Sequence, residues 1–267
     1  MKSDITIILL LYKTPLELIK NFKAFRKFNV IVLDQSNDRV FKKKLLKILP
    51  KIKNYTISKD NNGYAKGINI LVKKVKTKYF FCSQADVSIN ENSILELRKT
   101  ILRKKKNAVI AIPSINKKIK KKVKEIQVKN MIGATFLCDT KKFIEIGMFD
   151  EDFFFYWEDI ELSQRIKSFK YKIYESQRSK ATHRNGNSSL VGFKTDFIRY
   201  GNFIFGEFLY DYKIKKIRTL KLLRKLSQNI LLLIVNIFLL KFRNANICFS
   251  KVLGIIRFMW FILKRYL

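Results

Sequence analysis

Continuous apolar runs alternate with segments whose apolar residues recur every three or four positions through the first 112 residues. The continuous runs are typical of strands buried on both faces of a parallel sheet, and the spaced ones of helices that bury one side. This alternation predicts an α/β fold with a mostly parallel, doubly wound sheet. The predicted strands are residues 5–12, 29–33, 54–57, 79–82 and 108–112, and the predicted helices 16–25, 41–49, 63–75 and 93–102.

The pattern changes beyond this region. Residues 117–124 hold six lysines, which predicts a solvated loop or hairpin tip, and residues 133–138 form a further apolar strand. In the tail, residues 211–267, the apolar stretches 230–240 and 252–263 are each shorter than the roughly 20 residues of a spanning helix. We therefore expect a domain at 1–210 and a helical tail at 211–267.

The chain is strongly basic, with 56 Lys and Arg against 21 Asp and Glu, a formal charge of +35. Such a charge favours an anionic partner, namely nucleic acid, a phosphorylated ligand or the inner face of a membrane. A lysine-rich, AT-biased genome is the alternative explanation. Three cysteines without paired spacing and a single histidine exclude a zinc site and a disulfide framework, which predicts a reducing, cytoplasmic compartment.

Basic residues border both apolar stretches of the tail, which carries 13 Lys and Arg and one acidic residue. This combination favours helices that lie in an anionic membrane interface, on the inner face of the cytoplasmic membrane. The alternative is an ordinary helical pair packed on the first domain.

Two carboxylates follow predicted strands, where ligands bind in doubly wound sheets. Asp34 can accept hydrogen bonds from a nucleoside, although a strand-end Asp also serves as a turn or helix cap. Asp86 can hold Mg²⁺ or Mn²⁺ beside a diphosphate. Between them, the Asn62-Gly63 turn precedes a helix whose free N–H groups can face a nucleotide, or the turn can simply connect strand and helix.

The segment 149–162 combines six acidic residues with interleaved aromatics. A carboxylate held among aromatics is a plausible general base, and Tyr156 or Trp157 can stack on a sugar ring. An acidic helix N-terminus would account for Glu158 and Asp159 but not for the aromatics. The single histidine, His183, lies in a polar, glycine-containing setting that favours a phosphate contact or a metal ligand.

Taken in order, these motifs resemble those of the family 2 nucleotide-sugar glycosyltransferases, above all their rhamnosyltransferase-like branch. The resemblance extends from about residue 4 to 190, and its most specific part is 149–165. The matching motifs are Asp34-Gln35-Ser36, Asn61 to Asn69, Gln84-Ala85-Asp86-Val87, Gly133-Ala134, Phe149 to Arg165, and His183 to Ser188.

The resemblance implies a GT-A fold, a nucleoside diphosphate-sugar donor, a divalent metal and inversion at the anomeric carbon. Asp159 would be the base, with Glu158 as its rival, and Trp157 and Tyr156 would meet a saccharide or lipid-linked acceptor. His183 would reach the metal or the diphosphate together with Asp86. The implied donor-binding residues are Asp34, Asn62, Gly63, Asn69 and Asp86.

Three residues depart from the branch. Gln84 stands where related enzymes carry the first Asp of Asp-x-Asp, Ala85 replaces a Pro, and Gln35 replaces an Asn. These departures leave an inactive scaffold as an alternative function. A nucleic-acid-binding protein is a further alternative. The acidic and aromatic cluster would repel the phosphates of a nucleic acid, so we expect no specific nucleic-acid partner.

Overall fold

The computed structural model describes residues 2–104, 107–117, 123–184 and 192–266. The chain divides into two compact units. We call residues 1–150 with 159–190 the sheet unit, and residues 151–158 with 191–267 the helical unit. The division falls between Glu158 and Asp159. Residues 151–158 belong to the helical unit, and residues 159–190 belong to the sheet unit.

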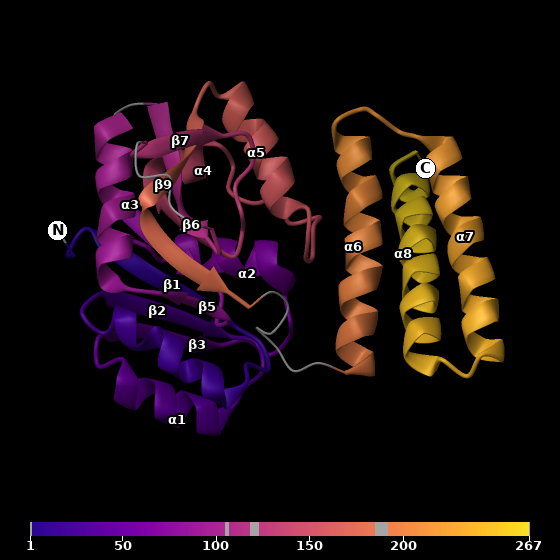
Figure 1. The fold of residues 1–267 in the computed structure, drawn as a ribbon, viewed down its shortest axis with the longest axis horizontal. Helices are drawn as coiled ribbons and strands as arrows, with labels where there is room; N and C mark the ends of the chain where they lie inside the picture. The colour runs from indigo at the N-terminus through magenta and orange to yellow at the C-terminus, as the bar shows by residue number, and fades with distance from the viewer. Residues whose placement is uncertain (1, 105–106, 118–122, 185–191, 267) are drawn as a thin grey trace. The chain divides into compact units, whose positions relative to one another are not determined.

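The expected α/β architecture is confirmed in the sheet unit, where helices flank a central sheet (Figure 1). The strand order is β3-β2-β1-β4-β8-β6-β9-β5, with β7 paired to β9. The pairs among β3, β2, β1 and β4 are parallel, and β8 is antiparallel to both β4 and β6. The strands are β1 Ile5–Leu11, β2 Asn29–Asp34, β3 Ile52–Ile57, β4 Tyr79–Ser83, β5 Val87–Ile89, β6 Ala108–Ile115, β7 Glu125–Val128, β8 Thr135–Asp139 and β9 Lys172–His183.

Apolar burial explains the central strands. Ile5, Ile7, Ile8 and Leu9 are fully buried, so β1 has no solvent-facing side over most of its length. The surrounding helices are η1 Leu16–Phe25, a 3₁₀ helix, then α1 Arg39–Ile48, α2 Gly63–Val72, α3 Glu91–Lys104, α4 Thr140–Glu145 and α5 Glu158–Ser168. They bury apolar side chains, in the main core cluster for η1, α1 and α3 and at positions such as Ile68, Phe143 and Leu162 for the others.

The strands β5, β7 and β9 were not predicted. Strand β9 buries polar side chains, among them Glu175, Ser176 and Gln177, so it lacks the apolar pattern by which strands are recognised. Strands β5 and β7 have only three and four residues. Most of the lysine-rich segment expected as a loop, residues 118–122, lies outside the described residues.

The helical unit contains α6 Phe193–Lys213, α7 Thr219–Phe238 and α8 Phe242–Tyr266. Its core includes Phe153 from the 151–158 segment together with Phe205, Phe208 and Phe258. Gly254 allows α6 and α8 to approach closely, because a Cβ atom there would lie 2.4 Å from the Gly201 carbonyl oxygen.

The domain boundary predicted after residue 210 lies inside α6, and α6 packs against α8 within the helical unit. One expectation for the tail needs correction, namely that its apolar stretches are too short to span a membrane. Phe242–Arg265 is a helix of 24 residues whose most apolar window of 18 residues has a mean hydropathy of 1.6, which suffices by length and composition alone.

Candidate active site

Asp34 closes the turn that follows β2. Its Oδ1 accepts hydrogen bonds from the backbone N–H and the hydroxyl of Ser36, both at 2.8 Å. Its Oδ2 accepts from the Tyr55 hydroxyl at 2.9 Å and from the Asp38 N–H at 3.3 Å. Burial, followed by the charge of Asp34, raises the pKa of Tyr55, which keeps this donor protonated. The carboxylate that sequence analysis assigned to the donor thus also holds the strand-end turn in shape.

Gln35 fastens the turn before α2, a role that sequence analysis missed. Its Oε1 accepts from the Asn62 N–H at 2.7 Å, and its Nε2 donates to Asn61 Oδ1 and to the Gly63 carbonyl oxygen at 3.2 and 3.3 Å. Gly63 adopts a φ of 76°, which favours glycine, so the Asn-Gly turn is built as expected. The side chain of Gln35, which is longer than the Asn of the related branch, therefore links the motifs at residues 34–36 and 61–63 by hydrogen bonds.

Gly133 connects this turn to the predicted base. Its carbonyl oxygen accepts a hydrogen bond from the Tyr64 hydroxyl, and its N–H donates to Asp159 Oδ2 at 3.0 Å. A Cβ atom on residue 133 would lie 3.4 Å from the Asp159 carboxylate, so glycine leaves room for that side chain. The next carbonyl, of Ala134, accepts from the Gln84 N–H at 2.8 Å, which leads to the strand end that carries Asp86.

Asp159 is held at the start of α5, and the residue as a whole is partly buried. Besides the Gly133 contact, its Oδ1 accepts from the Ile160 N–H at 2.9 Å. Burial raises the pKa of the Asp159 carboxyl, and the backbone hydrogen bonds oppose this shift. A fixed carboxylate with a raised pKa has the properties of a general base.

Asn69 and Arg165 stabilise the segment before α5. Asn69 is buried, and its amide donates to the Phe149 carbonyl at 2.9 Å and accepts from the Phe149 N–H at 3.1 Å. Arg165 donates to the carbonyls of Ile146 and Met148, both at 2.6 Å, and pairs with Glu161. Asn69, predicted to bind the donor, thus positions the backbone of the acidic segment.

Asp86 and His183 are brought together by the antiparallel pair β5–β9. His183 lies opposite Val87 in the register, and its Nε2 is 3.4 Å from Asp86 Oδ2. Both side chains are buried or nearly so, and the Asp86 carbonyl accepts from the Arg184 N–H at 3.1 Å. The described residues contain no cluster of three or more metal-ligating side chains. Residues 185–188 of the His183 motif lie outside the described residues.

Tyr156, Trp157 and Glu158 belong to the helical unit. Tyr156 and Trp157 have φ values of 72° and 73°, an uncommon conformation for side chains of this size that recurs at functional sites. The Trp157 ring stacks on Tyr210 of α6 with centroids 5.6 Å apart, and within the described residues its indole N–H has no hydrogen-bond partner. Glu158 is buried in this arrangement.

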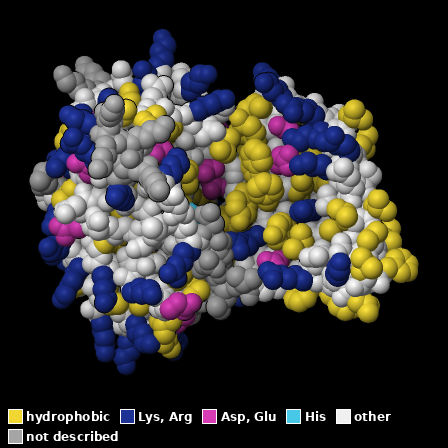
Figure 2. Space-filling model, in the orientation of Figure 1, with side chains coloured by type: hydrophobic (Ala, Val, Ile, Leu, Met, Phe, Trp, Pro, Cys, Tyr) yellow, Lys and Arg dark blue, Asp and Glu magenta, His cyan; other side chains and the backbone are white. Residues whose placement is uncertain are grey.

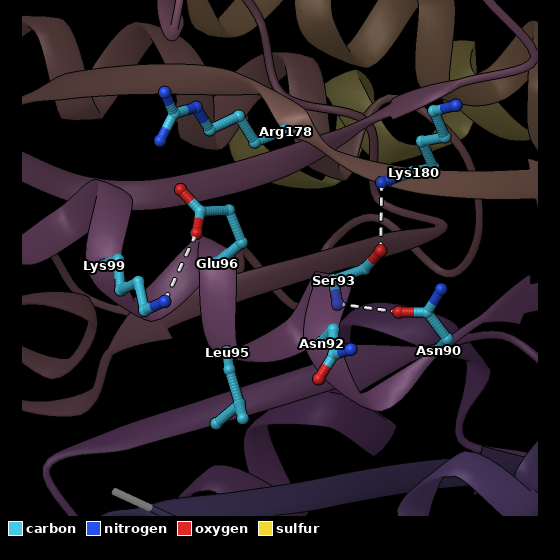
Figure 3. Close-up of a pocket in the computed structure, with 8 residues that line it drawn as sticks. All are labelled: Asn90, Asn92, Ser93, Leu95, Glu96, Lys99, Arg178 and Lys180. Carbon is cyan, nitrogen blue, oxygen red and sulfur yellow. Dashed lines mark hydrogen bonds and ion pairs between the residues drawn. The ribbon is translucent and has the colours of Figure 1, made fainter.

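A separate cavity of about 310 Å³ lies between α3 and β9 (Figure 3). Ser93 on its floor accepts from the Lys180 N–H at 3.1 Å, and Asn90 caps the helix by accepting from the Ser93 N–H at 2.8 Å. None of the residues predicted for the active site lines this cavity, so it is distinct from the site described above.

Comparison with known families decides the assignment. The sequence description of glycosyl transferase family 2 matches residues 10–162, more than half of the chain and the part that carries the hydrogen-bonded motifs. The chain belongs to glycosyl transferase family 2. A comparison with curated protein sequences finds no significant match.

Solved structures agree with this family in fold. A mannosyltransferase from Pyrobaculum calidifontis, PcManGT, solved with GDP-Man and Mn²⁺, matches with a TM-score of 0.59 at 12% identity. The match covers 80% of this chain and 65% of PcManGT. TarS from S. aureus, residues 1–349 with UDP-GlcNAc, matches with a TM-score of 0.53 at 15% identity, over 75% of this chain and 66% of TarS. The GT-A-like fold of the sheet unit is thereby confirmed, with this chain spanning about two thirds of each neighbour.

Proposed function

We propose that the protein is an inverting glycosyltransferase that moves a sugar from a nucleoside diphosphate-sugar to a saccharide or lipid-linked acceptor in cell-surface polysaccharide synthesis. The motifs at residues 61–69 and 149–165 resemble the rhamnosyltransferase-like branch, so rhamnose is the first donor sugar to test. The neighbours solved with GDP-Man and UDP-GlcNAc support a nucleotide-sugar donor.

One observation carries this proposal: a continuous path of hydrogen bonds and short chain segments joins the predicted donor and catalytic residues within the sheet unit. It runs from Gln35 to the 61–64 turn, through Tyr64 to Gly133, and from Gly133 to Asp159. From Ala134 it continues through Gln84 to the Asp86–His183 pair. A path that served only to stabilise the fold would not need Asp159, a carboxylate with a raised pKa, at one end. Nor would it need the carboxylate–imidazole pair of Asp86 and His183 at the other.

In the proposed reaction, Asp159 accepts the proton of the acceptor hydroxyl while the hydroxyl oxygen attacks the anomeric carbon. The attack comes from the face opposite the diphosphate, so the configuration inverts. The Gly133 and Ile160 N–H groups hold the carboxylate in one orientation throughout. Base catalysis of this kind contributes about 10²–10⁴-fold to the rate. Tyr156 and Trp157 would meet the acceptor, as the resemblance implies.

The chemistry of the Asp86–His183 pair fits a divalent cation. A carboxylate and an imidazole with ligand atoms 3.4 Å apart suit Mn²⁺ or Mg²⁺ when the remaining positions are filled by phosphate oxygens and water. When bound, the ion would neutralise negative charge on the leaving diphosphate. Asp86 and His183 would hold it, with Asp86 also keeping His183 oriented.

We further propose that the helical unit adsorbs to the anionic inner face of the cytoplasmic membrane. Hydrophobic side chains gather on the surface of this unit (Figure 2), and Phe238 and Leu240 at the α7–α8 turn are 83% and 71% exposed. Lys241 and Arg243 follow this turn directly. Apolar burial and basic charge would then act together, each basic residue contributing roughly 1 kcal/mol near an anionic surface.

A thermal-shift screen of nucleoside diphosphate-sugars, with Mn²⁺ or with a chelator, tests the proposal. The full chain is expected to be stabilised by at least one donor, and more strongly with Mn²⁺. Asp86→Asn is expected to keep the wild-type melting temperature in the absence of ligand. It is expected to lose the part of the donor's stabilisation that depends on Mn²⁺. Absence of stabilisation by every donor would contradict the proposed function.

A further inference from the structure

A groove of about 420 Å³ lies between α6 and α8, entirely within the helical unit. Its floor is formed where Gly201 and Gly254 let the two helices approach, and its volume is in the range of small-molecule sites. Leu253, Ile256 and Trp260 form apolar walls and are 38%, 40% and 59% exposed. An apolar occupant would therefore bury surface that now faces solvent.

Arg257 is the charged residue in this lining. Its Nη2 donates to Asn202 Oδ1 at 2.7 Å, and its guanidinium lies 4.1 Å from the centre of the Phe205 ring. Asn202 is buried, and its own Nδ2 donates to the Ile198 carbonyl at 2.7 Å, which fixes the oxygen that faces Arg257. The guanidinium is thus held in place by a neutral amide and an aromatic ring.

The charge of Arg257 is not balanced by a carboxylate. In the part of the chain that the structure describes, no acidic side chain pairs with it, whereas Arg243 pairs with Asp196 at 2.7 Å and Arg265 with Asp152 at 2.9 Å. A preorganised, unbalanced guanidinium beside apolar walls is suited to an anion attached to an apolar chain, since its planar donors match phosphate oxygens.

We propose that the α6–α8 groove binds a lipid phosphate, a long apolar chain that ends in a phosphate or diphosphate, with the head group on Arg257 and the chain along Leu253, Ile256 and Trp260. By length and composition alone α8 is apolar enough to cross a membrane, so the groove lies on a helix that suits the surroundings of a lipid chain. This inference rests on the proposed function and narrows its acceptor to the lipid-linked class.

Vesicle flotation of the full chain tests the proposal. Phosphatidylcholine vesicles would carry a polyprenyl phosphate, the uncharged polyprenol, or phosphatidylglycerol at the same negative charge as the polyprenyl phosphate. The wild-type chain is expected to bind the polyprenyl phosphate vesicles more tightly than either of the others. Inorganic phosphate is expected to compete weakly, because it lacks the chain that fills the groove. Equal binding to phosphatidylglycerol and polyprenyl phosphate would overturn the proposal in favour of general attraction to charge.

Two pairs of variants separate the groove from the general basic surface. Arg257→Gln is expected to bind polyprenyl phosphate vesicles about ten- to hundredfold less tightly, as is usual on loss of a hydrogen bond to a charged group. Arg224→Gln removes the same charge from the exposed face of α7 and is expected to keep the preference.

Leu253→Glu places a carboxylate one helical turn before Arg257 and is expected to abolish the preference, whereas Leu253→Gln, which removes apolar wall without adding charge, is expected to weaken it much less. Because Leu253 is exposed, this pair remains informative if Arg257→Gln does not fold. Retention of the preference in both Arg257→Gln and Leu253→Glu would overturn the proposal. Donor binding, measured separately by thermal shift, reports on the proposed function and is expected to be unchanged in all four variants.

Discussion

At the scale of single residues, the site depends on backbone groups as much as on side chains. Gly133 contributes an N–H to Asp159 and a carbonyl to Tyr64, and its missing side chain leaves space for the carboxylate. Gly133-Ala134 is recognisable as a motif in the sequence, but the sequence predicts no role for it. Hydrogen bonds made by the main chain leave no residue-type pattern, so only the folded structure reveals this connection.

The pKa of Asp159 leads to a prediction on stability. Because burial raises this pKa above its value in the unfolded chain, the folded state favours the protonated form. The resulting stabilisation is present at low pH and is lost as the pH rises through the raised pKa. We therefore expect Asp159→Asn to have an equal or higher melting temperature than the wild type at pH 7, while transfer falls by about 10²-fold or more.

The same assignment sets the pH profile. The wild-type rate is expected to fall as the pH drops through the raised pKa, because the protonated carboxyl cannot accept the acceptor's proton. Glu158→Gln is the control and is expected to keep this acidic limb. If Glu158→Gln lost the acidic limb of the profile while Asp159→Asn remained active, Glu158 and not Asp159 would be the base.

Removing either member of the Asp86–His183 pair gives a second prediction at this scale. Asp86→Ala is expected to weaken binding of a nucleoside diphosphate in the presence of Mn²⁺, with little change in the presence of a chelator, because the carboxylate acts through the cation. His183→Ala is expected to behave in the same way to a smaller extent. Isothermal titration with and without metal provides the measurement, and equal weakening in both conditions would show that Asp86 acts without metal.

At the scale of elements, the 151–158 segment connects the base to the helical unit. Gly206 of α6 lies against this segment, since a Cβ atom there would be 3.0 Å from both Trp157 Cδ1 and the Tyr156 carbonyl oxygen. Asp152 pairs with Lys213 at 2.6 Å and Phe153 is part of the helical core. The helix α5, which carries Asp159, starts at Glu158, the last residue of this anchored segment.

This arrangement makes Tyr210 a positioning residue for Trp157. Tyr210→Ala is expected to lower the transfer rate by about ten- to hundredfold, because the stacked ring that holds Trp157 is removed. Tyr210→Phe keeps the ring and is expected to transfer at near the wild-type rate. Binding of the nucleotide is expected to be unchanged in both, so an equal loss of donor binding in Tyr210→Ala would indicate general unfolding instead.

The elements also show how far sequence reasoning reaches. The strands β1, β2, β4 and β6 were predicted because they are apolar at nearly every position. Strand β9 was missed because a buried polar strand has the composition of a loop, and with it the pairing that places His183 beside Asp86. Asp34, Asp86 and Asp159 could be selected from strand ends and motif order. Gln35, which looked like a departure from the family pattern, could be understood only once its three hydrogen bonds were located.

At the scale of the whole molecule, charge is spread over the entire chain, whereas exposed apolar surface is extensive on α7 and α8 (Figure 2). Residues 1–210 alone carry a net charge of +23, from 43 basic and 20 acidic residues. Electrostatic attraction by itself would therefore not distinguish the helical unit from the rest of the chain. Apolar insertion at the α7–α8 turn is the property that the helical unit adds.

Membrane binding can be tested at this turn without cutting through α6. Phe238→Glu combined with Leu240→Glu is expected to reduce sedimentation with anionic vesicles about tenfold or more, since two exposed apolar side chains no longer insert. Val40→Glu, on the exposed face of α1, is the matched control and is expected to change little. Binding should also weaken as salt rises, because exposed charges are screened over about 8–10 Å near physiological ionic strength. Equal sedimentation of the double variant and the control would contradict membrane association through the turn.

Release of nucleoside diphosphate from a panel of nucleotide-sugars, in the presence of Mn²⁺ and with the full chain, tests the central claim most directly. The account predicts that the wild type releases nucleoside diphosphate from at least one donor, with transfer to an acceptor. Asp159→Asn is predicted to bind the same donor but to release the product at a rate lower by about 10²-fold or more. Product release by Asp159→Asn at the wild-type rate, or no release from any donor by a folded wild-type chain, would contradict it.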